Sequence, residues 1–159
     1  MLKRKIEQTL LSRFEYKNHN PLILKGCRQC GKTFSTLQFV KQHYSQVIYL
    51  NFFENPEYKA IFENSLQVDL LIMMSAFIGL TARFVPHETV IVLDEIQECP
   101  QARTALKFFK LDGRFDVLAT GSLLDISGYR SQEYSILVGY VRLYSTRLTR
   151  KSRITSFLF

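Results

Sequence analysis

A glycine-rich segment near the N-terminus constrains the fold of this chain more than any other feature. It fits the pattern G-x-x-x-x-G-K-[ST] and reads Gly26-Cys27-Arg28-Gln29-Cys30-Gly31-Lys32-Thr33. A short apolar run, residues 22–24, comes directly before it, and Leu37, Phe39 and Val40 behind it favour a helix. A strand that leads through such a loop into a helix is the context in which this pattern binds phosphate.

Each fixed position of this loop has a chemical reason. Gly26 and Gly31 allow backbone angles that turn successive N–H groups into one concavity, and the following helix adds unpaired donors. We expect Lys32 to contact the β- and γ-phosphates of ATP and the hydroxyl of Thr33 to ligate Mg²⁺. The predicted nucleotide site therefore comprises the whole loop together with Phe34, the residue that follows it.

Cys27 and Cys30 also form a C-x-x-C pair, which allows a different interpretation. A redox pair needs its first cysteine at a helix N-terminus, and a zinc site needs a second pair, whereas only Cys99 remains. We therefore predict that both cysteines only fill positions of the phosphate loop. The odd total of 3 cysteines favours a reducing cytoplasm over a disulfide framework.

A second candidate site element is an apolar run, residues 89–93, that ends in Asp94 and Glu95. In open parallel sheets, ligands bind at the carboxyl ends of the strands. Asp94 is thus expected beside Thr33, holding Mg²⁺ directly or through water. Glu95 is expected to orient or deprotonate the attacking water. The alternative is a solvated acidic turn.

Thr120 and Ser122 follow the next predicted strand, residues 115–119. A hydroxyl there can contact the γ-phosphate, so we predict a sensor residue and prefer Thr120 because it is nearer the strand. A helix cap is the alternative, since serine is a favoured cap residue. An arginine could stabilise charge on the transferred phosphoryl group, but nothing local distinguishes Arg103, Arg114 or Arg130.

The net charge of +7 is unevenly distributed, because residues 141–159 contain 5 of the 21 basic residues and no acid. A solvated basic end is the simpler interpretation, and contact with nucleic acid is the alternative. The longest apolar stretch, residues 66–80, contains Asp69 and falls short of the roughly 20 residues that span a bilayer. We predict a buried helix there and no membrane association.

The remaining pattern alternates between strands and helices. Helices are expected at residues 2–16, 34–43, 57–80 (in two pieces) and 101–110, and strands at residues 22–24, 47–53, 89–93, 115–119 and 137–144. Such alternation predicts an α/β fold with a parallel sheet covered by helices on both faces.

Four stretches, residues 21–33, 90–100, 105–110 and 117–122, together resemble AAA-type P-loop ATPases. The likeness is to the prokaryotic family that couples this domain to a C-terminal domain of unknown function (the AAA_14/DUF4143 type). Its Walker A and Walker B motifs are widespread, whereas the runs Asp-Glu-Ile-Gln-Glu-Cys-Pro and Ala-Thr-Gly-Ser-Leu-Leu are more specific. The resemblance implies a P-loop NTPase sheet of strand order 5-1-4-3-2, ATP hydrolysis, a sensor at Thr120 or Ser122, and self-association.

The C-terminal end departs from this family. We predict an ATP-binding core over residues 1–144 and a basic tail over residues 145–159 outside the family fold, as in a truncated chain. Two functional hypotheses follow. The chain is an Mg²⁺-dependent ATPase, or it is a nucleotide-binding interaction module without useful turnover that contacts a protein or nucleic acid partner.

Overall fold

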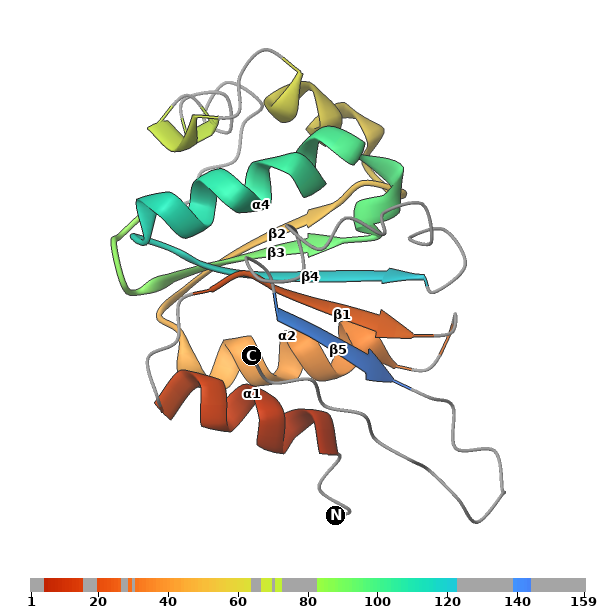
Figure 1. Ribbon diagram of the computed structural model, residues 1–159, viewed down its shortest axis with the longest axis vertical. Helices are drawn as coiled ribbons and strands as arrows, with labels where there is room; N and C mark the ends of the chain where they lie inside the picture. Colours follow the sequence, from red (N-terminus) through yellow and green to blue (C-terminus); the bar gives the residue numbers. More distant parts are fainter. Residues whose placement is uncertain are drawn as a thin grey trace.

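A five-stranded parallel sheet forms the centre of the molecule (Figure 1). The computed structural model describes residues 5–15, 20–26, 29, 31–63, 67–69, 71–72, 83–122 and 139–143. The strands are β1 (Leu22–Gly26), β2 (Gln46–Asn51), β3 (Thr89–Asp94), β4 (Asp116–Ser122) and β5 (Gly139–Leu143). Their spatial order is β2-β3-β4-β1-β5, which confirms the predicted order 5-1-4-3-2.

Helices cover both faces of this sheet, as predicted. Figure 1 shows α1 (Lys5–Glu15) and α2 (Lys32–His43) on one face and α4 (Pro100–Asp112) on the other, together with the 3₁₀ helix η1 (Pro56–Phe62). Alternate residues of β1 to β4 divide accordingly: in β3, Val90 and Val92 pack towards α1 and α2, whereas Ile91 and Leu93 pack towards α4. All six residues of β3 are buried, which explains why its sequence is a continuous apolar run.

Local sequence signals set the ends of the helices. Gly31 precedes α2 in the left-handed region, with φ of 80°, and Gly113 ends α4 in the same region, with φ of 69°. Pro100 opens α4, a position at which its missing N–H costs nothing. The helices predicted at residues 2–16, 34–43 and 101–110 and the five predicted strands are present, with ends shifted by a few residues.

The segment between β2 and β3 differs from the prediction. The described part of residues 57–80 contains a 3₁₀ helix, η1, and helical residues Val68, Asp69, Leu71 and Ile72, while the rest of the predicted buried helix lies outside the described residues. Apolar residues such as Ile61 and Phe62 are buried in either kind of helix, so the apolar pattern could not distinguish them.

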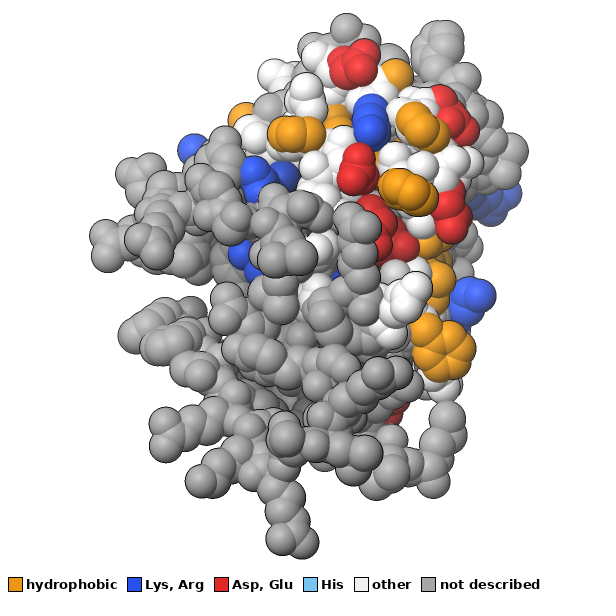
Figure 2. Space-filling model, turned by 90° about the vertical axis from the view of Figure 1, so that its right-hand side faces the viewer, with side chains coloured by type: hydrophobic (Ala, Val, Ile, Leu, Met, Phe, Trp, Pro, Cys, Tyr) orange, Lys and Arg blue, Asp and Glu red, His pale blue; other side chains and the backbone are white. Residues whose placement is uncertain are grey.

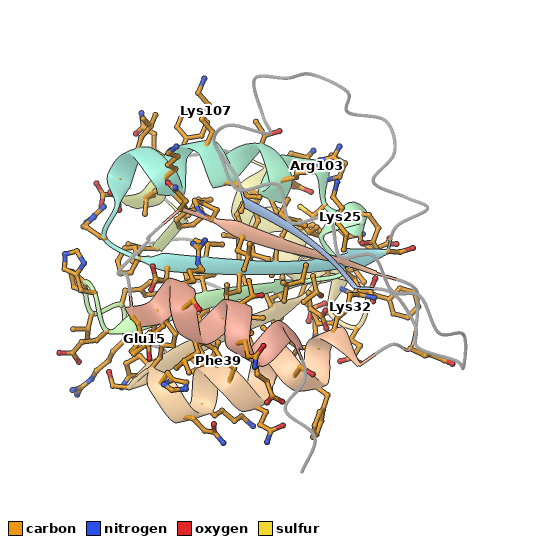
Figure 3. All side chains as sticks on the ribbon, turned by 60° about the horizontal axis from the view of Figure 1, so that its bottom comes forward. Glu15, Lys25, Lys32, Phe39, Arg103 and Lys107 are labelled. Atoms are coloured by element: carbon orange, nitrogen blue, oxygen red, sulfur yellow. The ribbon has the colours of Figure 1, made fainter. Side chains whose placement is uncertain are left out.

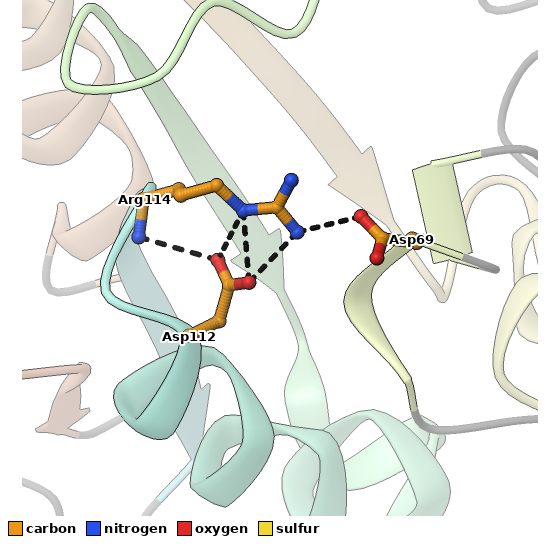
Figure 4. Close-up of polar contacts among 3 residues, drawn as sticks. All are labelled: Asp69, Asp112 and Arg114. Carbon is orange, nitrogen blue, oxygen red and sulfur yellow. Dashed lines mark hydrogen bonds and ion pairs between the residues drawn. The ribbon is translucent and has the colours of Figure 1, made fainter.

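Arg114 joins this segment to the C-terminal end of α4 (Figure 4). Its guanidinium lies 2.6 Å from a carboxylate oxygen of Asp69 and 2.7 Å from one of Asp112. These two acids raise the pKa of Arg114, first through their hydrogen bonds. Because Arg114 comes just before β4, it lies at the amino edge of the sheet, opposite the phosphate loop. Arg114 is therefore not available to stabilise phosphoryl charge, and Arg130 lies outside the described residues.

In the part of the chain that the structure describes, no helix is long and apolar enough to cross a membrane. The predicted basic tail, residues 145–159, lies outside the described residues.

Candidate functional site

The carboxyl ends of four neighbouring strands bring the candidate residues together. Asn51, the last residue of β2, pairs in register with Asp94, the last residue of β3. In the same way Gly26 of β1 pairs with Ser122 of β4, and Leu24 pairs with Thr120. The sheet therefore gathers the start of the phosphate loop, the acidic end of β3 and the hydroxyls of β4 at one edge, as expected for an open parallel sheet.

Figure 2 views the molecule towards this edge of the sheet. Over the described part of that face, acidic and apolar side chains are interspersed around a few basic ones. Exposed residues of the segment after β2 contribute Phe53, Glu54 and Glu57 to the described surface.

The phosphate loop is described at its two ends and at Gln29. Gly31 and Gln29 both have positive φ, 80° and 59°, the backbone geometry that directs N–H groups into a shared concavity. The N–H of Ser35 donates to the carbonyl of Gly31 at 3.0 Å and starts the hydrogen-bond pattern of α2. The N–H groups of the first turn therefore have no partner within the helix itself. Cys27, Arg28 and Cys30 lie outside the described residues.

Lys32 lies at the start of α2, beside the ends of β1 and β5 (Figure 3). Its ammonium donates to the carbonyl of Gly26 at 3.2 Å, and the residue is only 6% exposed. A buried ammonium is stable only when its protons are hydrogen-bonded. This hydrogen bond joins Lys32, near the end of the loop, to Gly26 at its beginning. Phe34, by contrast, is 65% exposed on the same turn.

Asp94 is the most densely contacted polar group of the site. It is 2% exposed, and its carboxylate accepts hydrogen bonds from the hydroxyls of Thr33 on α2, Tyr49 on β2 and Thr120 on β4. The amide of Asn51 and the backbone N–H of the following residue, Glu95, add two further donors. This set of donors offsets the cost of burying an ionised carboxylate.

The oxygen atoms of Thr33 and Asp94 fit Mg²⁺. The hydroxyl of Thr33 lies 3.0 and 3.1 Å from the two carboxylate oxygens of Asp94. Mg²⁺ takes octahedral oxygen ligands at about 2.0–2.1 Å, which puts adjacent ligand oxygens roughly 3 Å apart. Within the described residues, no three His, Cys, Asp or Glu side chains group closely enough to hold a metal ion. A metal here would therefore also need phosphate or water oxygens, as is usual for Mg²⁺.

Glu95 has an unusual backbone conformation at the end of β3, with φ of 53° and ψ of 49°. A non-glycine residue in this left-handed region is strained and is often found at a functional site. Its carboxylate accepts a hydrogen bond from the side-chain amide of Gln97. Gln97 lies in η2 (Ile96–Glu98), and its side-chain oxygen accepts from the backbone N–H of Ser122 at 3.3 Å.

Comparison with known families identifies the chain. The sequence model described as an AAA domain (AAA_14) matches residues 18–147, which is most of the chain. The chain belongs to this AAA domain family. Membership supports nucleotide binding, and no curated protein matches the sequence of the chain.

Solved structures confirm the fold of this AAA domain. It is similar to PCH-2 from C. elegans, with a TM-score of 0.52 and 11% sequence identity over 89% of this chain and 42% of that one. It is also similar to AMPPCP-bound DnaA from Aquifex aeolicus, with a TM-score of 0.51 and 15% identity over 86% of this chain and 45% of that one. The chain thus spans less than half the length of either protein, and the likeness concerns the P-loop ATPase fold alone.

Sequence reasoning missed three polar residues of this AAA domain, namely Tyr49, Asn51 and Gln97. The first two lie on alternate positions at the carboxyl end of β2, and the hydroxyl of Tyr49 donates to Asp94 at 2.7 Å. Burial, followed by this hydrogen bond, raises the pKa of Tyr49, so the phenol stays protonated and remains a donor at neutral pH. The sequence carries no signal for the first two, because Tyr49 and Asn51 fall inside the predicted strand 47–53 and only the structure ends this strand at Asn51.

Replacing Tyr49 with phenylalanine tests this contact. Tyr49→Phe removes a hydrogen bond to a charged group, worth about 1.5–3 kcal/mol, and leaves the apolar ring in place. We expect a lower midpoint of urea unfolding and a changed Mn²⁺ affinity, measured by titration in the presence of a non-hydrolysable ATP analogue. Tyr58→Phe is the matched control, since Tyr58 packs against the other core. Equal Mn²⁺ affinities and equal stabilities of Tyr49→Phe and wild type would contradict a role for this hydroxyl at Asp94.

Proposed function

We propose that this AAA domain binds Mg²⁺-ATP and hydrolyses it to ADP and phosphate. The observation that carries the proposal is the contact of Thr33 with both oxygens of Asp94, at 3.0 and 3.1 Å. It joins the end of the phosphate loop to the acidic end of β3, and these are the two parts that a nucleotide-metal site requires. The AMPPCP in the name of the DnaA structure supports ATP as the nucleotide.

Binding would use the residues at the carboxyl edge of the sheet. The loop amides and the first turn of α2 present N–H donors to the phosphates, and Lys32 exchanges its contact with the carbonyl of Gly26 for phosphate oxygens. Thr33 and Asp94 would hold Mg²⁺, which neutralises charge that develops on the phosphate oxygens. Thr120, whose hydroxyl lies against Asp94, would sense the γ-phosphate from β4.

Hydrolysis needs a base near the γ-phosphate, and we assign this role to Glu95. Its carboxylate accepts a proton from water as the water oxygen bonds to the γ-phosphorus. The bond from that phosphorus to the β–γ bridging oxygen breaks, and ADP leaves with the bond's electron pair. Glu95 returns its proton to solvent after phosphate leaves. The left-handed backbone at Glu95 supports the assignment, because strain of this kind concentrates at functional positions.

Calorimetric titration with ATP, with and without Mg²⁺, tests the proposal. We expect micromolar binding that Mg²⁺ strengthens in the wild type. In Thr33→Val, which keeps the shape of the side chain and removes the hydroxyl, this strengthening should disappear. Thr104→Val is the matched control, because the hydroxyl of Thr104 only contacts the carbonyl of Pro100 within α4.

Phosphate release, measured on the same samples, separates the two functional hypotheses. Steady release supports the ATPase. Tight binding without release would instead make the chain a nucleotide-binding interaction module. Absence of binding by well-folded protein would reject both hypotheses.

A further inference from the structure

Gln97 has both ends of its side-chain amide engaged at the site, and the proposed reaction assigns it no role. Its nitrogen donates to a carboxylate oxygen of Glu95, and its oxygen accepts from the backbone N–H of Ser122 at 3.3 Å. The first partner is the proposed base at the end of β3. The second is the last residue of β4, so this one side chain bridges two neighbouring strands.

We propose that Gln97 is a positioning residue that holds the carboxylate of Glu95 in place relative to the end of β4. The inference rests on the proposed role of Glu95 as the base. An amide suits this task because it is neutral at every pH and carries a donor and an acceptor on one rigid plane. It can fix one carboxylate oxygen while the other remains to accept a proton from water.

The backbone around Gln97 is suited to hold this side chain still. The N–H of Glu98 donates to the carbonyl of Glu95 at 2.9 Å, and the N–H of Cys99 donates to the carbonyl of Ile96 at 3.1 Å. Pro100 then opens α4 with a restricted backbone. Ile96, on the other side of Gln97, is fully buried in the core below α4. The short η2 turn is thus fixed at both ends.

The hydrogen bond between Gln97 and Ser122 connects Glu95 to β4. Ser122 is 2% exposed and pairs in register with Gly26, whose carbonyl accepts from Lys32. Two residues earlier on the same strand, Thr120 donates to Asp94. Gln97 therefore links Glu95 to β4. The same strand pairs with the start of the phosphate loop and donates to Asp94, the carboxylate proposed to hold the metal.

Two substitutions at position 97 test the two hydrogen bonds of its side chain. Gln97→Met keeps the length of the side chain and loses both hydrogen bonds. Gln97→Glu retains an oxygen that accepts from Ser122 but replaces the donor to Glu95 with a second carboxylate. We expect both variants to lower kcat for ATP at least tenfold while KM and the affinity for ATP change less than twofold. Gln101→Met and Gln101→Glu are matched controls at an exposed position of α4 and should keep wild-type kcat.

The same substitutions in a Glu95→Gln background decide whether Gln97 acts through Glu95. If it does, Gln97→Met causes no further loss in that background. A further tenfold loss would overturn the proposal. Wild-type turnover by Gln97→Met, with Glu95→Gln inactive, would overturn the positioning role alone. Full turnover by Glu95→Gln would reject Glu95 as the base, and with it the premise of the positioning role, while ATP hydrolysis itself would stand.

A measurement without turnover completes the test. The side-chain amide signals of Gln97 in a ¹⁵N-labelled chain are identified by their loss in Gln97→Met. Glu95→Gln should shift these signals, and Glu98→Gln should leave them in place. Signals that do not respond to Glu95→Gln would show that the bridge is absent in solution and would overturn the proposal even for a chain that releases no phosphate.

Discussion

Replacing Lys32 with alanine should weaken ATP binding about 100-fold or more. Lys32 supplies a buried cation, 6% exposed, at the start of α2. Hydrogen bonds to charged groups are worth about 1.5–3 kcal/mol each, and about 2.8 kcal/mol corresponds to 100-fold in affinity. The loop amides and the helix N-terminus would remain, but they carry only partial charges. Calorimetric titration of both proteins with Mg²⁺-ATP measures the loss directly.

Two controls separate lost binding from lost folding. Lys32→Met retains most of the aliphatic stem and should bind as weakly as Lys32→Ala, since the loss concerns the charge. Lys41→Ala removes an exposed lysine in the last turn of the same helix and should bind ATP like the wild type. Both Lys32 variants should unfold cooperatively in urea. Wild-type affinity in a folded Lys32→Ala protein would exclude the loop as the phosphate site.

Most of the fold could be predicted because local pattern and topology agree. The strand Thr89–Asp94 is apolar over residues 90–93 because it is central and covered on both faces. The phosphate-loop motif then specifies a strand before it and a helix after it. The segment around η1 could not be predicted as well, because burial of Ile61 and Phe62 is compatible with several backbone geometries.

The site residues that could be predicted belong to a sequence motif or, like Thr120, come directly after a predicted strand. Lys32, Thr33 and Asp94 belong to such motifs, and the structure brings Thr33 and Asp94 into contact. Tyr49 belongs to none. It reaches Asp94 because β2 pairs with β3 in one particular register, Asn51 opposite Asp94. Register depends on the whole sheet, and a shift of one residue would turn Tyr49 to the other face.

Glu95 raises the question of what a carboxylate contributes that an amide of the same shape does not. Glu95→Gln should keep ATP affinity within twofold of wild type, because the glutamine oxygen can still accept from Gln97 and no phosphate contact is assigned to this side chain. The rate of phosphate release should fall about 100-fold or more, since glutamine cannot accept a proton and general-base catalysis contributes roughly 10²–10⁴-fold. Calorimetry and a phosphate-release assay on one preparation measure both quantities.

Glu98→Gln provides the matched control, an identical chemical change three residues further along the same turn. Glu98 lies 3.9 Å from Lys59 in a half-exposed ion pair, which contributes little to stability in water. That variant should bind and hydrolyse ATP like the wild type, so any loss specific to Glu95→Gln must come from position 95. Reduced binding by Glu95→Gln would mean that its carboxylate supports the nucleotide site itself. Undiminished release would place the base elsewhere on the carboxyl edge of the sheet.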